Sequence, residues 1–334
     1  MLMRRALLTD RQTIQYGDGE APVPQAGQLL VRVLATGICG SDLATYHGTH
    51  PYKRPPVILG HELCGRVEIP AAGFEVGDLV CAAAYAHCGR CPACVTDRTN
   101  LCRHKRNLCH AGWEGSFAEY VVLEREMTYK LPPGLDPVLG ALVEPLTIGL
   151  HAVRLLGSGA RRSLHVIGAG NIGLACVVSA RRLGFGTITC TDLGAAKGER
   201  ATRLGADEYV DATTAVVPAD SADTLIVASS HPGVIRQALA AVKPGGTVVV
   251  VSFLAAAEEL DVNSLVGREV TMIGSALSTP SDFHTVIGWL AEGSLDVRAM
   301  ITHQMPLAEA ATAMRAMARG GDTGKIILIP GAHE

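Results

Sequence analysis

One stretch decides the fold of this chain: Ser163-Leu-His-Val-Ile-Gly-Ala-Gly-Asn-Ile-Gly-Leu-Ala175. It places the pattern Gly-x-Gly-x-x-Gly between an apolar run typical of a buried strand and a run compatible with a helix. Gly168 permits a tight turn, Gly170 lets a ligand approach the backbone, and Gly173 permits close packing of the helix on the strand. The stretch predicts a dinucleotide-binding turn, and the alternative is a glycine turn without a ligand.

The residues expected to bind this cofactor extend to the end of the next strand. Asn171 and Ile172 begin the predicted helix, whose free N–H groups attract phosphate. The next apolar run ends at Asp192, at the distance expected of an acid that binds the adenosine ribose. A carboxylate there accepts hydrogen bonds from the ribose hydroxyls and repels the 2′-phosphate of NADP, so we expect NAD. Lys197 is a further candidate for the ribose.

The pattern of apolar and turn-forming residues changes near residue 150. After it, apolar runs at 163–168, 187–191, 224–228, 247–252 and 270–274 alternate with helix-compatible segments at 172–183, 199–204 and 234–242. This alternation predicts a parallel, doubly wound sheet. Before it, short β-type runs at 29–35, 65–69 and 117–123 lie between Gly- and Pro-rich segments and predict an irregular β domain. Helices at 282–290 and 307–318 and a strand at 325–329 complete the chain.

Four cysteines have the spacing of a closed metal site. Cys88, Cys91, Cys94 and Cys102 read C-x2-C-x2-C-x7-C, which brings four thiolates within reach of one tetrahedral zinc ion. Such a site leaves no position for substrate, so its expected function is stability. The alternatives are free or disulfide-paired thiols, or a zinc ribbon for nucleic acid. A ribbon would need a second knuckle pair and a basic surface, and the sequence offers neither.

A second set of metal donors is mixed in chemistry. Cys39 offers a thiolate and His61 an imidazole. Glu144 offers an oxygen just before the segment of alternating strands and helices begins. A mixed set can leave one coordination position open, as catalytic zinc requires. Taken singly, each residue also has a structural interpretation: a core cysteine, a satisfied histidine or a helix-capping acid.

Several motifs in order carry a family resemblance: Gly-Ile-Cys39-Gly-Ser-Asp42, Gly60-His-Glu62, the four cysteines, Gly115-Ser-Phe-Ala-Glu-Tyr120, Val143-Glu-Pro145 and the glycine turn. The chain resembles the zinc-dependent medium-chain alcohol dehydrogenases, in their polyol, sorbitol and threonine dehydrogenase branch. The resemblance implies an α/β protein with a GroES-like β domain and a Rossmann doubly wound parallel sheet. Residues 1–150 and 277–334 would form the catalytic zinc domain, and 151–276 the NAD-binding domain.

The resemblance also implies roles for individual residues. Cys39, His61 and Glu144 match the three ligands of the catalytic zinc, and Glu62 is similar to an acid that moves in and out of the zinc shell. Whether Glu62 or Glu144 binds zinc directly stays open. Asp42 matches the carboxylate that orients the histidine.

The implied reaction is oxidation of an alcohol. Zinc acts as a Lewis acid on the substrate oxygen, and a hydride passes to the nicotinamide. Ser41 matches the hydroxyl that takes the alcohol proton. The family's next relay member is a histidine at the position that is Ala44 here, so either His47 or water would have to continue the relay.

Composition restricts partners and location. The net charge of -3 gives no general attraction to nucleic acid or membrane, and the N-terminal apolar run is too short for an export signal. We therefore expect a cytoplasmic protein whose ten cysteines stay reduced. The family implies a homodimer or homotetramer, often joined through the edges of Rossmann sheets, and the apolar run 247–252 is compatible with such joining.

The sequence thus predicts an enzyme that binds two zinc ions per chain, one catalytic and one structural. It would oxidise a polar secondary alcohol with NAD. Aromatic residues make up only 4% of the chain, and the third expected ligand is an acid. Both features favour a polar substrate, and resemblance to the polyol and threonine dehydrogenase branch implies a polyol, sugar alcohol, cyclitol or amino alcohol. The alternatives are a metal-independent quinone or enoyl reductase of the same fold, or a noncatalytic zinc-stabilised NAD-binding protein.

Overall fold

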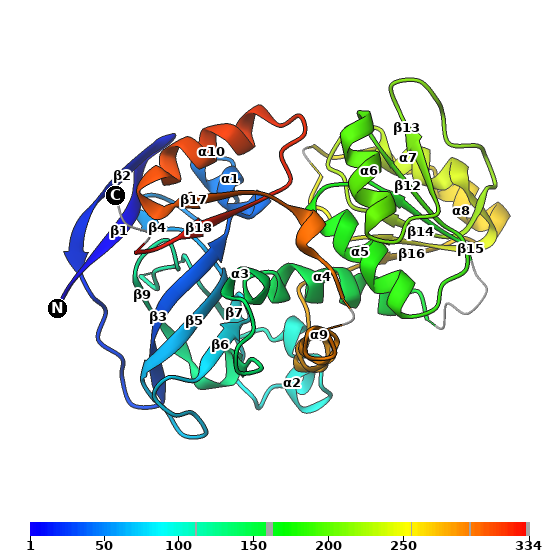
Figure 1. Ribbon diagram of the computed structural model, residues 1–334. Helices are drawn as coiled ribbons and strands as arrows, with labels where there is room; N and C mark the ends of the chain where they lie inside the picture. Colours follow the sequence, from blue (N-terminus) through cyan, green and yellow to red (C-terminus); the bar gives the residue numbers. More distant parts are fainter. Residues whose placement is uncertain (111, 158–162, 255, 294, 332–334) are drawn as a thin grey trace. The chain divides into compact units, whose positions relative to one another are not determined.

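The computed structural model of this chain describes residues 1–110, 112–157, 163–254, 256–293 and 295–331. The chain divides into two compact units (Figure 1). Unit 1 comprises Met1–Glu144, Phe283–Leu295 and Ile301–Glu334, and unit 2 comprises Pro145–Asp282 and Asp296–Met300. The domain limits expected from the sequence, at residues 150 and 277, were drawn where the pattern of strands and helices changes. The assignment of catalytic and NAD-binding functions to these segments remains a prediction.

Unit 1 is built on β-sheets. A seven-stranded sheet follows the order β10 (Thr128–Lys130), β6 (Leu79–Ala82), β5 (Glu62–Ile69), β3 (Gln28–Gly37), β18 (Lys325–Ile329) and β17 (Ile301–Pro306), with β9 (Tyr120–Glu124) also paired to β3. A second sheet has the order β2 (Thr13–Glu20), β1 (Leu2–Asp10) and β4 (Val57–Ile58). A short pair, β7 (Tyr85–Ala86) and β8 (Arg106–Asn107), flanks the four-cysteine segment. The predicted β domain is confirmed.

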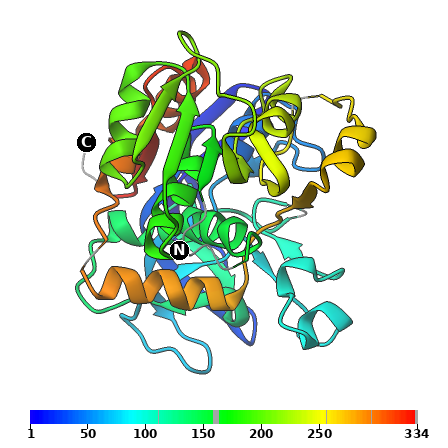
Figure 2. The ribbon, with the colours of Figure 1, turned by 90° about the vertical axis from the view of Figure 1, so that its right-hand side faces the viewer.

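The helices of unit 1 are few and mostly short: α1 (Gly40–Tyr46), α2 (Pro92–Val95), α3 (Pro137–Gly140), α9 (Pro280–Ala291) and α10 (Ala310–Arg319), with α4 (Val143–Arg154) beginning at its end. The segment around α2 forms a small lobe on the body of unit 1, coloured cyan in Figure 2. Isolated four-residue helices have little stability of their own, so α2 depends on what binds its cysteines.

The C-terminal segment completes the main sheet of unit 1. Strand β18 pairs antiparallel with β3 near Gly37, and β17 pairs parallel with β18 (Figure 1). The sequence predicts β18 but not β17, because β17 alternates weakly and exposes His303 and Gln304. Because β18 pairs with β3, Lys325 at the start of β18 lies close to the end of β3, which leads to Cys39.

Unit 2 is a parallel sheet in the order β13 (Glu208–Asp211), β12 (Ile188–Asp192), β11 (Leu164–Ile167), β14 (Ala222–Val227), β15 (Val242–Val250) and β16 (Thr271–Gly274). Its helices are α5 (Asn171–Arg182), α6 (Ala195–Arg203), α7 (Val234–Ala241) and α8 (Val262–Arg268), and it also holds α4 from Pro145 onward. In order of sequence the strands read 3-2-1-4-5-6, the order of the doubly wound dinucleotide-binding fold. The predicted fold class is confirmed.

Two details of unit 2 correct the expectations from sequence. The run 247–252 lies largely in β15, between β14 and β16, so it does not form the edge of the sheet; β16 does. The sequence also gives no signal for β13, a short and half-buried edge strand. Apolar side chains such as Leu225, Val227 and Val248 bury the sheet against α7.

None of the helices within the described residues is long and apolar enough to span a membrane.

Candidate zinc and dinucleotide sites

The glycine turn of unit 2 has the geometry that its sequence predicts. Gly168 adopts φ = 106°, and a Cβ there would lie 2.6 Å from the carbonyl oxygen of Ala228. A Cβ on Gly173 would lie 1.7 Å from the carbonyl oxygen of Gly168, so only glycine closes this turn. Gly170, by contrast, has nothing within 4 Å of its added Cβ. Its backbone is therefore open to a ligand at the N-terminus of α5.

Polar groups around this turn suit the rest of a dinucleotide. The amide oxygen of Asn171 is buried without a hydrogen-bond partner. Asp192 accepts hydrogen bonds from Ala169 N at 2.7 Å and from Leu193 N at 2.6 Å, so it is fixed at the end of β12. Lys197 Nζ donates to Asp192 Oδ1 at 2.7 Å. The structure thus brings Lys197 to the carboxylate that the sequence assigns to the ribose.

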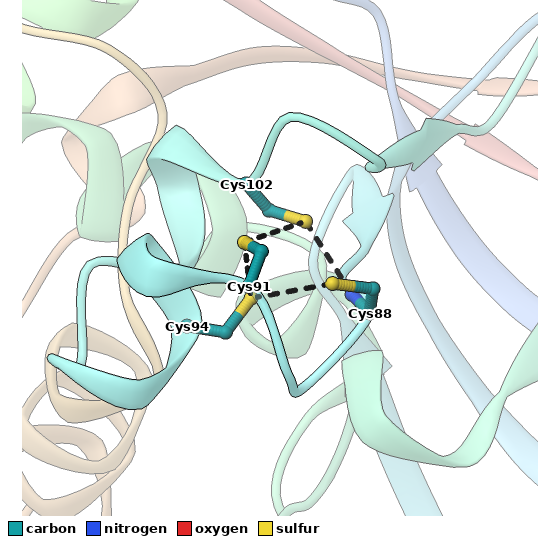
Figure 3. A group of neighbouring side chains, drawn as sticks. All are labelled: Cys88, Cys91, Cys94 and Cys102. Atoms are coloured by element: carbon teal, nitrogen blue, oxygen red, sulfur yellow. Dashed lines mark hydrogen bonds between the residues drawn. The ribbon is translucent and has the colours of Figure 1, made fainter.

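The four cysteines of the predicted structural site converge on one point (Figure 3). Three Sγ–Sγ separations among Cys88, Cys91, Cys94 and Cys102 are 3.5, 3.8 and 4.0 Å. Zn–S bonds of about 2.3 Å at tetrahedral angles place sulfurs roughly 3.8 Å apart. The four sulfurs therefore fit one zinc ion, as the sequence predicts.

Local structure explains this convergence. Gly89 turns the chain at φ = 70°, and Pro92 begins α2 directly after Cys91. A hydrogen bond from the backbone N–H of Cys94 is the main reason that the pKa of the Cys91 thiol falls to about 6. A lower pKa favours the thiolate, which is the form that binds metal.

The second donor set lies in unit 1 where β3, α1 and β5 meet. One ligand atom from each of Cys39, His61 and Glu62 lies within 4.8 Å of the others. His61 is 5% exposed, and its Nδ1 is buried without a hydrogen-bond partner. Burial alone would lower the pKa of His61, but the charges of Asp42 and Cys39 outweigh it and raise that pKa well above its usual value. This environment favours a positive charge, which suits a bound cation.

Asp42 organises the set. It accepts a hydrogen bond from Cys39 N at 3.0 Å and another from Gly60 N at 3.4 Å, and its Oδ1 lies 3.6 Å from His61 Nδ1. The backbone on either side of the histidine is equally constrained. Gly60 adopts φ = 95°, and a Cβ there would lie 2.4 Å from the ring of Phe117. Asp42 therefore faces His61 as the resemblance implies.

Glu144 stands outside the group formed by Cys39, His61 and Glu62. It is 6% exposed at the start of α4, and burial raises its pKa to about 7, with a further contribution from Glu62. His61 and Lys325 act in the opposite direction. The structure thus gathers two of the three expected ligands with Glu62, and keeps Glu144 within electrostatic range.

Sequence reasoning missed the cation that pairs with Glu62. Lys325 Nζ lies 2.5 Å from Glu62 Oε2 and donates to Ile38 O at 3.0 Å. A Cβ on Gly37 would lie 2.2 Å from the same carboxylate oxygen, so the glycine two residues before Cys39 makes room for Glu62.

A second missed residue is Cys109, which the sequence suggests only as a buried thiol. Its Sγ, a nitrogen of His61 and an oxygen of Asp42 lie within 4.8 Å of one another. It donates to Gly60 O at 3.2 Å and adopts φ = 61°. Residues in left-handed turns carry no simple sequence signal when they are not glycine or asparagine.

The expected relay residues follow Cys39 directly. Ser41 lies in the first turn of α1. Ala44, three residues further along the same helix, has no polar group in its side chain. His47 ends α1, its carbonyl is bound by Arg11, and its ring meets Tyr46 edge-on at 5.4 Å. The structure gives His47 a role in ending the helix.

Comparisons with known proteins agree with this geometry. Residues 25–133 match the alcohol dehydrogenase GroES-like domain, and residues 171–292 match the zinc-binding dehydrogenase domain. The chain is 32% identical to an L-galactonate-5-dehydrogenase of Escherichia coli, over 86% of this chain and 87% of that protein. It is 29% identical to a sorbitol dehydrogenase of Halalkalibacterium halodurans, over 98% and 99% of the two chains.

Comparison with solved structures points to the same family of proteins. A structure from Sinorhizobium meliloti 1021, bound to NADP and provisionally assigned as a zinc-binding dehydrogenase, matches with a TM-score of 0.91 at 31% identity. The match covers 99% of this chain and 100% of that one. Family models, identity and fold agree, and this chain belongs to the zinc-dependent medium-chain alcohol dehydrogenase family.

Proposed function

We propose that this chain oxidises a secondary alcohol group of a polar, polyhydroxylated substrate to a ketone, with NAD+ as the acceptor. The observation that carries the proposal is the convergence of Cys39, His61 and Glu62 within 4.8 Å. A metal-independent reductase would not need a half-buried thiol beside a buried imidazole and a buried carboxylate, nor an aspartate that faces the imidazole.

The donor set fits zinc, since sulfur, nitrogen and oxygen ligands are those that zinc prefers. When bound, zinc supplies a Lewis acid for the substrate oxygen, and NAD+ supplies the hydride acceptor. Cys39 and His61 would hold the metal, with Glu62 or Glu144 as the oxygen ligand. Cys88, Cys91, Cys94 and Cys102 would hold a second zinc that stabilises their lobe.

The chain's own residues position and move the proton. Asp42 holds the His61 ring, and Lys325 holds Glu62. We assign Ser41 as the residue that accepts the alcohol proton, because it follows Cys39 closely on α1. Since Ala44 carries no polar group, the proton would continue through His47 or through water.

The cofactor would occupy the glycine turn of unit 2. Gly168, Gly170 and Gly173 shape the turn, and Asn171 and Ile172 present N–H groups to the pyrophosphate. Asp192, with Lys197 beside it, would bind the ribose hydroxyls.

NAD is the preferred form in this proposal because the Asp192 carboxylate repels a 2′-phosphate. The Lys197 ammonium at 2.7 Å reduces that repulsion. Because the similar structure from Sinorhizobium meliloti is bound to NADP, the ratio of kcat/KM for NAD+ to that for NADP+ should be measured for this chain.

We also infer a cytoplasmic homodimer or homotetramer. The ten cysteines are free, which suits a reducing compartment. On unit 2, Phe253, which follows β15, is 93% exposed, and Val266 in α8, the helix that precedes the edge strand β16, is 73% exposed. Light scattering of the purified protein tests the assembly, and a monomer mass would exclude it; cell fractionation tests the compartment.

The test of the function is NADH formation across four substrate classes: polyols, sugar acids, amino alcohols and simple secondary alcohols. The proposal expects turnover concentrated in the polyhydroxylated classes. Turnover of simple alcohols alone would contradict the assigned substrate class. Tight NADH binding with no turnover of any alcohol would favour a noncatalytic protein.

A further inference from the structure

A cysteine beside the predicted catalytic metal group is held in an unfavourable backbone conformation. Cys109 is fully buried and adopts φ = 61°, a left-handed angle that residues with a side chain rarely adopt. Such a conformation persists only where the surrounding structure enforces it, and it is found most often at functional sites. A cysteine that only filled space in the core would not need this backbone. The conformation therefore directs attention to what the thiol contacts.

The thiol binds the peptide group that precedes His61. Cys109 Sγ donates to the carbonyl oxygen of Gly60 at 3.2 Å, and the backbone N–H of Ser116 donates to the same oxygen at 2.9 Å. Two donors thus hold this carbonyl group. Because the peptide is planar, fixing its carbonyl also fixes the plane that contains His61 Cα, from which the imidazole extends.

The neighbouring chain leaves space for this sulfur atom. A Cβ on Gly115 would lie 2.5 Å from Cys109 Sγ, 2.5 Å from the carbonyl oxygen of Gly60 and 2.4 Å from that of Leu59. A side chain at position 115 would therefore displace the thiol or the segment that leads to His61. The absence of a side chain at Gly115 is compatible with the contact between Cys109 and Gly60.

The thiol also lies beside the His61 imidazole. One nitrogen of His61, a carboxylate oxygen of Asp42 and Cys109 Sγ all lie within 4.8 Å of one another. The His61 side chain is 6% exposed, and its Nδ1 has no hydrogen-bond partner among the described residues. Asp42 Oδ1, at 3.6 Å from Nδ1, attracts the ring by charge but lies too far away for a hydrogen bond. The orientation of the ring therefore depends strongly on the backbone that Cys109 holds.

We propose that Cys109 is a positioning residue for the catalytic metal: its thiol fixes the peptide between Gly60 and His61 and so holds His61 in place as a ligand. This proposal rests on the proposed function, because His61 must bind the zinc on which turnover depends. In this role the thiol touches neither the metal nor the substrate. Removal of a group that orients a metal ligand lowers metal affinity or activity about 10–100-fold.

The test measures how tightly each zinc ion is held, and it requires no turnover. Wild type and variants are equilibrated with zinc buffers of decreasing free concentration, and the bound zinc is counted at each step. Cys109→Ala removes the thiol and keeps a left-handed side chain, Cys109→Gly removes both, and Cys109→Ser keeps a donor. Gln12→Gly is the control, since Gln12 adopts φ = 59° in an exposed turn between β1 and β2. His61→Ala identifies the zinc that belongs to the catalytic group.

We expect the zinc of the Cys39–His61–Glu62 group to leave Cys109→Ala and Cys109→Gly at a free zinc concentration about 10–100-fold higher than in wild type. The zinc of the four cysteines should be held as in wild type, which provides an internal reference in every sample. Cys109→Ser should recover part of the affinity, because its hydroxyl can donate to the same carbonyl. Gln12→Gly should hold both ions as wild type does.

Wild-type affinity in either variant that lacks the thiol would overturn the positioning role while the dehydrogenase function stands. An equal loss of affinity at both zinc sites would overturn it too, because it would show a general loss of stability. A third zinc ion that is bound by wild type and lost with the thiol would make Cys109 a ligand instead. If Cys109→Ala does not fold, Cys109→Gly decides alone, since glycine adopts this backbone without strain. A wild type that holds only the zinc of the four cysteines would contradict the proposed function itself, and the role of Cys109 with it.

Discussion

The Lys325 ammonium and the Glu62 carboxylate form an ion pair at 2.5 Å, and each side chain is 1% exposed. The two residues lie 263 positions apart in the sequence. The pair joins the last strand of unit 1 to the residue after His61. It explains why the C-terminal segment returns to this unit, since without β18 the Glu62 carboxylate would be buried with no counter-ion.

Removing one partner of this pair should destabilise the fold. We expect Lys325→Met to lower the free energy of unfolding by about 3–5 kcal/mol, because a buried carboxylate is left uncompensated. Urea unfolding of the zinc-loaded protein measures the change. The matched control is Arg32→Ala, which breaks a 3.2 Å pair with Glu68 whose side chains are 50% and 40% exposed. That control should cost about 1 kcal/mol or less, and equal losses for the two variants would contradict a buried pair.

Loss of one cysteine from the lobe should remove one metal ion. We expect Cys94→Ser to lower zinc content by about one ion from about two per chain, because a closed site needs four ligands. Metal analysis of the purified protein measures this. Cys190→Ala, which changes a buried cysteine of unit 2, should keep the wild-type content. Unchanged zinc in Cys94→Ser would exclude the four-thiolate site.

Asp192 should determine the choice between NAD and NADP. In Asp192→Ser the Lys197 ammonium loses its carboxylate partner and becomes available to a 2′-phosphate. The preference for NAD+ over NADP+, taken as the ratio of kcat/KM values, should fall about tenfold or more, which corresponds to about 1.4 kcal/mol. Asp207→Asn is the control, since Asp207 pairs with Arg181 elsewhere in unit 2. An unchanged ratio in Asp192→Ser would remove Asp192 from the ribose site.

Ser41 should be required for proton removal. Ser41→Ala should lower kcat about 10²–10⁴-fold, the range for loss of a general acid–base group, and Ser41→Thr should retain much of it. Activity of Ser41→Ala close to wild type would mean that another group takes the proton. His47→Ala tests the outer relay: an unchanged pH profile of kcat would leave water as the carrier.

Local patterns were sufficient to predict the elements that glycine and cysteine shape. The glycine turn, the four-cysteine segment and β18 are in the structure where the sequence places them, because each depends on residues close together in the chain.

Long-range partners were beyond the sequence. Nothing near Lys325 indicates that it binds Glu62, and nothing near Cys109 indicates that it lies beside His61. Strand β17 was missed because its outward residues His303 and Gln304 hide the alternation.

The central claim is that Cys39 and His61 hold a metal on which turnover depends. The direct measurement is the rate of NADH formation from the best polyhydroxylated substrate before chelation, after chelation, and after zinc is returned, with His61→Ala alongside. The account predicts loss of turnover on chelation, recovery with zinc, and no recovery in His61→Ala. A chelated protein from which zinc analysis finds no metal, yet which still turns over at the wild-type rate, would contradict it.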